Sequence, residues 1–154
     1  MEDIKIKGSH GVHFIPTVDF NAKTGVFEIS GESYLEDTIK FYKPILDWLK
    51  EYTSIIRKPI TFNFKLTYFN TNSSRSILDI MKILKKYEQI GGKVNVNWYY
   101  NEDDIDMEDI EDFSIDTDLT INLIDEDENI LAIKPLKDGR INKTVIKGDF
   151  DDYD

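Results

Sequence analysis

Cysteine is absent from the 154-residue chain, and histidine occurs only twice. Without thiols, the chain has no route to thiol catalysis, disulfides or thiolate metal sites. No apolar run approaches the ~20 residues that a membrane helix needs. The first residues, MEDIKIKGSHG, also lack the apolar centre of a signal peptide. We therefore expect a cytoplasmic protein that does not insert into a membrane.

Positive charge is scarce as well, because 19 Lys and Arg residues face 30 Asp and Glu residues for a net charge of -11. An acidic surface repels phosphate backbones, so nucleic acid is not an expected partner. Hydrophobic residues make up 40% and aromatics 12% of the chain, which is enough for a packed core. The length fits one domain with a terminal extension.

The first part of the chain predicts a hairpin over residues 12–30, with strands before Pro16 and from Val26. Ser33 and Glu36 have the spacing of a capping box, which predicts that a helix starts there. Pro44 should kink or restart that helix. Its apolar face is expected to carry Leu35, Ile39, Tyr42, Leu46 and Leu49.

Residues 60–68 alternate strictly between apolar and polar, which predicts a strand with Ile60, Phe62, Phe64, Leu66 and Tyr68 on one face. After a polar loop, residues Ile77, Ile80, Met81, Leu84 and Tyr87 follow helical spacing up to Gly91 and Gly92. A further alternating strand covers residues 94–100. This strand–helix–strand unit predicts a right-handed crossover between parallel strands.

The composition changes after Tyr100, where residues 101–118 are rich in Asp and Glu, and residues 101–112 are interpreted as an acidic loop. Apolar runs at residues 119–123, 130–136 and 141–146 predict further strands, with a turn at Asp138 and Gly139. The tail, residues 149–154, should be mobile. The predicted fold is α/β, a mixed sheet flanked by helices in the order β-β-α-β-α-β. We divide it into a main domain, residues 1–113, and an extension, residues 114–154.

Motifs for catalysis and metal binding are weak or missing. His10 and His13 lack a third ligand, so ordinary surface histidines are favoured over a metal site. The acidic run from Asp103 to Asp109 fails the EF-hand pattern, because Asp109 and Ile115 stand where Gly and Glu are needed. No phosphate-binding loop or nucleophile elbow appears. We therefore expect no catalytic residue, metal or cofactor, and a protein that is not an enzyme.

The segment from Asn70 to Arg75 joins an apolar strand to an amphipathic helix. Asn, Thr and Ser are common N-cap residues, so a purely structural role is favoured from the residues alone. The alternative is a phosphoacceptor, because the N-terminus of a helix attracts anions. A phosphate there would add negative charge without an arranged cation and would repel a partner.

Several stretches together resemble the SiaC family of bacterial regulatory phosphoproteins. They span residues 16–104, and one departure is Leu35, where the family has Pro. The matching stretches are Pro16–Phe20, Gly31–Glu36, Phe41–Ile45 with Trp48–Leu49, Tyr68–Ser74, and Trp98–Tyr100 with Asp103–Asp104.

This resemblance implies a STAS-like fold and a partner-switching function. The partners that it implies are a serine/threonine protein kinase, a PP2C-type phosphatase and a diguanylate cyclase, which the unphosphorylated protein activates to raise cyclic di-GMP and promote biofilm formation. The implied phosphoacceptor is Thr71, with Ser73 and Ser74 as alternatives. The expected partner-binding residues are Asn70, Thr71, Asn72, Ser73, Ser74 and Arg75.

Two alternatives stay open at this point. One is a STAS-like partner in an anti-anti-sigma pathway that controls transcription. The other, less favoured, is a metal-binding or ligand-binding domain that uses the acidic residues 101–112.

Overall fold

The computed structural model describes residues 1–9, 14–101, 103 and 107–150. They form one eight-stranded mixed sheet whose strands lie in sequence order. The strands are β1 (Ile4–Ile6), β2 (Thr17–Asn21), β3 (Val26–Ser33), β4 (Ile60–Phe69), β5 (Val94–Tyr99), β6 (Ile121–Ile124), β7 (Ile130–Pro135) and β8 (Ile141–Lys147). The helices are α1 (Thr38–Glu51), which runs into a π-helical turn η1 (Tyr52–Ile56), α2 (Thr71–Gln89) and α3 (Met107–Thr117).

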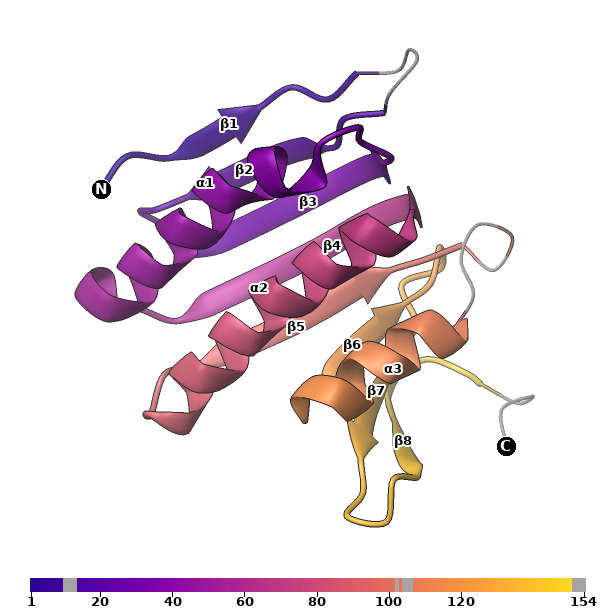
Figure 1. Ribbon diagram of the computed structural model, residues 1–154. Helices are drawn as coiled ribbons and strands as arrows, with labels where there is room; N and C mark the ends of the chain where they lie inside the picture. Colours follow the sequence, from indigo (N-terminus) through magenta and orange to yellow (C-terminus); the bar gives the residue numbers. More distant parts are fainter. Residues whose placement is uncertain (10–13, 102, 104–106, 151–154) are drawn as a thin grey trace.

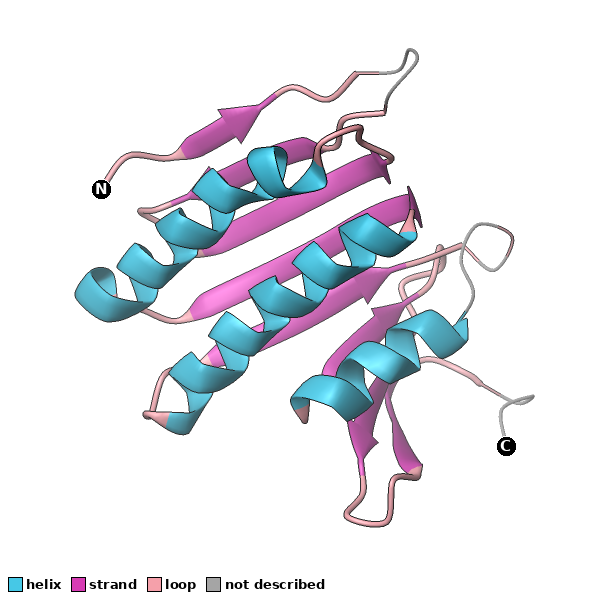
Figure 2. Cartoon of the chain, viewed as in Figure 1, coloured by secondary structure: helices cyan, strands magenta, loops and turns pink. Residues whose placement is uncertain are grey.

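The centre of the sheet is parallel and its two sides are antiparallel. Strands β3 to β6 run parallel, and β1, β2, β7 and β8 pair antiparallel at the edges. The connections α1, α2 and α3 all lie on the same face of the sheet (Figures 1 and 2). The mixed α/β fold and the parallel strand–helix–strand unit over residues 60–100 are therefore confirmed, but the helices cover one face rather than both.

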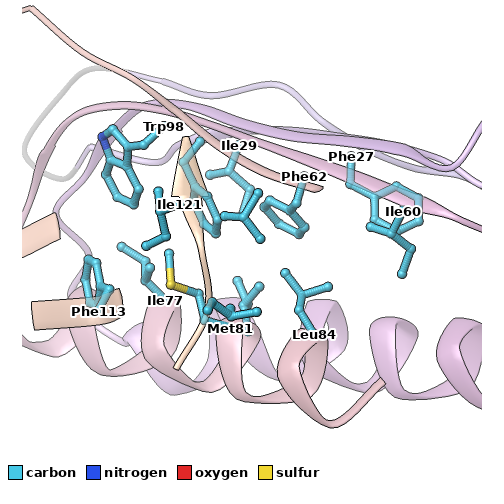
Figure 3. Packing of buried hydrophobic residues seen from close by; sticks show 14 of the residues in the cluster. Phe27, Ile29, Ile60, Phe62, Ile77, Met81, Leu84, Trp98, Phe113 and Ile121 are labelled. Carbon is cyan, nitrogen blue, oxygen red and sulfur yellow. The ribbon is translucent and has the colours of Figure 1, made fainter. Parts of the chain in front are cut away.

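The core fills the space between the helices and the covered face. Phe62, Trp98 and Ile121 project from three neighbouring strands toward Met81 of α2 and Phe113 of α3 (Figure 3). The helical face that the sequence predicts for α2 is confirmed, since all five of its apolar residues are buried. Helix α2 ends before Gly91, whose φ of +101° is a left-handed conformation that glycine adopts easily.

The opposite face of the parallel strands is polar, which explains how it tolerates water. Asn97 donates to Asn63 (2.9 Å), and Asn122 donates to Asn97 (3.0 Å) and Asn95 (2.8 Å). These side-chain bonds cross β4, β5 and β6. Parallel sheets are usually covered on both faces, and here the amide row replaces the second cover.

The N-terminal third differs from its prediction at several points. Strand β2 starts at Thr17, after the residues that were expected to form it, and β1 was not predicted. The capping-box prediction is wrong, because Asp37 is the N-cap of α1 and accepts from the Lys40 amide. Ile39, predicted in the core, is 77% exposed. Helix α1 runs through Pro44 without restarting.

The interpretation of residues 101–112 as an acidic loop is wrong from Met107 onward, since Met107–Thr117 forms α3. Its eleven residues include five acidic ones and no basic one. Ile110 and Phe113, one turn apart, bury its inner side against the core. The carboxylates occupy the remaining surface.

A bulge in β4 overturns the predicted position of Tyr68. The register passes from Gly31 opposite Leu66 to Glu32 opposite Tyr68, so Thr67 is an extra residue. Tyr68 is consequently 47% exposed, and its ring lies 6.2 Å from that of Tyr34. The next residue, Phe69, contacts the rings of Trp98 and Phe113 instead.

The C-terminal part continues the same sheet. The division at residue 113 falls inside α3, while β6, β7 and β8 extend the sheet, as the apolar runs predicted. The turn at Asp138 and Gly139 is confirmed by the β7–β8 pairing. Within the tail, Phe150 packs against the core cluster, so the expectation of an unpacked tail is wrong at that residue.

Candidate functional site

Thr71 is the first residue of α2 and lies where β4 ends. The N-cap is its neighbour Asn70, whose side chain accepts from the Ser73 amide (2.9 Å). Thr71 is therefore exposed without serving as the cap. Within the described residues, the Thr71 hydroxyl has no hydrogen-bond partner. Its oxygen is thus free to meet another molecule.

Ser73 differs sharply from Thr71, because its side chain is fully buried. Its hydroxyl donates to the Ser33 carbonyl (2.9 Å) and accepts from the Ser33 hydroxyl (2.8 Å). The Ser33 hydroxyl also bonds Tyr42 (2.7 Å). Burial raises the pKa of Tyr42 to about 12, although its bond to Ser33 opposes that rise. This buried chain of hydroxyls ties the first turn of α2 to β3 and α1.

Ser74 and Arg75 complete the first turn. Ser74 is half-buried, and its hydroxyl donates to the Thr71 carbonyl (2.7 Å). Arg75 is exposed one turn beyond Thr71 and forms no ion pair within the described part of the chain. The exposed members of the predicted partner-binding segment are therefore Thr71, Asn72 and Arg75.

A groove of about 300 Å³ separates the start of α2 from α3. The two helices lie next to each other in Figure 1. Phe69 and Phe113 supply aromatic surface in the groove. The other lining residues are Asn70, Thr71, Ser74, Arg75 and Leu78 on one side, and Asp109, Asp112 and Asp116 on the other. Thr71, Arg75 and Leu78 on α2, and likewise the three Asp residues on α3, are three or four residues apart, so each set lies on one face of its helix.

The groove was not predicted from the sequence. The signal that could have found it is the pair Ile110 and Phe113, whose spacing of three suggests a helix with the intervening acidic residues outside. That helix would follow a parallel strand and pack beside α2, as α3 does.

Other candidates from the sequence do not form a site. His10, His13, Asp104 and Asp106 lie outside the described residues. Among the residues that the structure does describe, no group of three His, Cys, Asp or Glu side chains is arranged to hold a metal ion. None of the described helices has both the length and the apolar character needed to cross a membrane.

Comparison with known proteins assigns the family. Residues 9–126 match the family described as SiaC family regulatory phosphoprotein. The chain belongs to the SiaC family. A relative, an uncharacterised protein of Pseudomonas aeruginosa strain UCBPP-PA14, is 26% identical over 101 residues, which are 66% of this chain and 78% of the relative. The resemblance inferred from residues 16–104 is confirmed, and the family match extends through α3 and β6.

Solved SiaC structures share the fold. Apo-SiaC from Pseudomonas aeruginosa superposes with a TM-score of 0.73 at 24% identity, covering 80% of this chain and 98% of the other. SiaC has also been solved in complex with the diguanylate cyclase SiaD, of which it is the activator. That match has a TM-score of 0.69 at 21% identity and covers 79% of this chain. Strands β7 and β8 of this SiaC family member lie beyond the family match.

Proposed function

We propose that this chain is a phosphorylation-controlled activator of a diguanylate cyclase. In its unphosphorylated form it binds the cyclase and raises cyclic di-GMP production. A serine/threonine kinase modifies Thr71 and stops the activation, and a PP2C-type phosphatase restores it. Membership of a regulatory phosphoprotein family and the SiaC–SiaD complex of a relative support this function.

Thr71 is proposed as the phosphoacceptor because its side chain is exposed, unlike that of Ser73. A kinase must reach the hydroxyl, and the Thr71 side chain is exposed while that of Ser73 is fully buried. A phosphate on Ser73 would place a dianion inside the hydroxyl chain with Ser33 and Tyr42, where desolvation is costly. Ser74 is half-buried and is the remaining alternative.

The partner surface is proposed to include the exposed start of α2 and the exposed tyrosines at the same end of the sheet. Tyr34, which follows β3, and Tyr68, near the end of β4, present a pair of exposed rings with centroids 6.2 Å apart. Tyrosines are enriched at protein interfaces, because they bury much area while keeping a polar tip. Burying a phosphate at Thr71 against a partner costs several kcal/mol when it is not fully paired, and each ~1.4 kcal/mol weakens binding tenfold.

The test combines phosphopeptide mapping with cyclase assays. The cognate kinase should label the wild type and Ser74→Ala, but not Thr71→Ala. Thr71→Ala should activate the cyclase constitutively, while Thr71→Glu and phosphorylated wild type should activate it less. Labelling that persists in Thr71→Ala would overturn the site. Capture of a transcription-control kinase with no cyclase activation would overturn the proposed output.

A further inference from the structure

Arg75 lies one helical turn after Thr71, on the same side of α2. Residues at this i, i+4 spacing are neighbours on a helix surface, with Cβ atoms roughly 5–6 Å apart. Both line the groove between α2 and α3. An arginine is well suited to a phosphate, since its planar guanidinium presents paired donors to two oxygens.

The opposite wall of the groove is negative. Asp109, Asp112 and Asp116 follow one face of α3, and Arg75 is the one basic residue among those lining the groove. Before phosphorylation, Arg75 lines the groove together with these carboxylates but forms no ion pair within the described residues. After phosphorylation of Thr71, a group with ~1.5–2 negative charges enters the same groove. The Arg75 guanidinium can then pair either with the phosphate or with the α3 carboxylates.

We propose that Arg75 is the phosphate partner within the chain and that its guanidinium pairs with the phosphate on Thr71. This inference rests on the proposed function, because it assigns the regulation of that same site. It also replaces the sequence-based view that a phosphate here has no arranged cation. The phosphate is then held at the start of α2, facing the acidic wall of the groove on α3.

Two consequences follow for the molecule. The phosphate is held on α2 by a charge-assisted pair, so it occupies the partner surface in a defined position. At the same time, repulsion between the phosphate and the acidic wall of the groove weakens the contact between α2 and α3. The modification is thereby transmitted from Thr71 to α3 without a change in strand pairing.

The second pKa of the phosphate tests directly whether Arg75 pairs with it. Phosphothreonine is genetically encoded at position 71, so the experiment does not depend on where any kinase acts. The second ionisation is followed by ³¹P NMR in the otherwise wild-type chain, Arg75→Ala, Arg75→Lys and Lys82→Ala. Lys82 is the matched control, because it is an exposed cation on the same helix but does not line the groove.

Arg75→Ala should raise the pKa of the phosphate by ~0.5 or more, because a nearby cation favours the dianion. Arg75→Lys should restore part of the effect, and Lys82→Ala should change it little. Asp112→Asn should lower the phosphate pKa, since one repelling carboxylate is removed. Equal effects of Arg75→Ala and Lys82→Ala would overturn the proposal, even where the kinase is shown to modify Thr71.

Hydrogen exchange supplies an independent readout on α3. Phosphothreonine at position 71 should speed exchange of the Met107–Thr117 amides relative to the unmodified chain. Asp112→Asn combined with Asp116→Asn should suppress that increase. If hydrogen exchange in α3 is the same with and without the phosphate, the effect of phosphorylation is not transmitted to this helix and the proposal is refuted on this point.

Discussion

Tyr42→Phe should lower stability at neutral pH and raise it at high pH. The hydrogen bonds of the buried hydroxyl chain explain the loss of stability at neutral pH. Ser33 donates its single hydroxyl proton to Ser73, and Ser73 donates its own to the Ser33 carbonyl, so Tyr42 must be the donor to Ser33. Removing the phenol leaves both serines with a partner. The expected loss at pH 7 is therefore that of one neutral hydrogen bond, about 1 kcal/mol.

The sign reverses with pH because the pKa of Tyr42 is raised by burial from 10.0 to about 12. The folded state holds this proton more tightly than the unfolded state. Its contribution to stability is complete below pH 10 and is lost as the pH rises from 10 toward 12. At ~1.36 kcal/mol for each pKa unit, the full loss is about 3 kcal/mol, of which about half has gone by pH 11.

Urea unfolding monitored by tryptophan fluorescence between pH 8 and pH 11 measures the difference. Wild type should be more stable by about 1 kcal/mol at pH 8, and the two proteins should become equal near pH 11. Burial also raises the pKa of Tyr52 and Tyr87, but these residues occur in both proteins and cancel. Tyr34→Phe, which removes an exposed phenol, is the control. A Tyr42→Phe difference that is the same at pH 8 and pH 11 would refute the reasoning.

Three further outcomes are expected. Asn70→Ala should cost ~0.5–2 kcal/mol in urea unfolding because Asn70 is the N-cap, whereas Thr71→Ala should cost less than ~0.5 kcal/mol; equal losses would contradict this division. Removing residues 149–154 should lower the melting temperature by ~2–4 °C, and Phe150→Ser alone should reproduce the decrease while Asp149→Asn should not. Phe69→Ala should destabilise the fold by ~3 kcal/mol and Tyr68→Ala by less than ~1 kcal/mol, the reverse of what uninterrupted alternation along β4 requires.

The sequence correctly predicted those elements in which the spacing of the apolar residues matches the set of residues that is buried. Helix α2 is the clearest case, since Ile77, Met81 and Leu84 keep strict spacing and a glycine ends the helix. The strand predicted at residues 60–68 was found for the same reason, but Tyr68 was assigned to the wrong face. The bulge at Thr67 depends on pairing with β3, which no local pattern reveals.

Helix α3 and the groove escaped prediction because charge obscured a short apolar face. Ile110 and Phe113 are the fully packed large apolar residues of α3, while Met107 is partly buried and Ile115 lies exposed. The false capping box has a different cause. Ser33 has the right spacing to Glu36, yet its hydroxyl is used in the buried chain with Tyr42 and Ser73. Thr71 could be singled out from sequence by resemblance, but its opposition to α3 required the packed structure.

Every strand of this sheet pairs only with the strands that precede and follow it in the chain. No strand must be inserted between two that are already paired, so the sheet can assemble progressively as the chain is synthesised. The same order leaves the last edge open to additions. Strands β7 and β8, which lie outside the family match, occupy that edge, while Thr71 follows β4 in the middle of the sheet. Evolution can therefore lengthen this edge without rebuilding the part of the molecule that carries the switch.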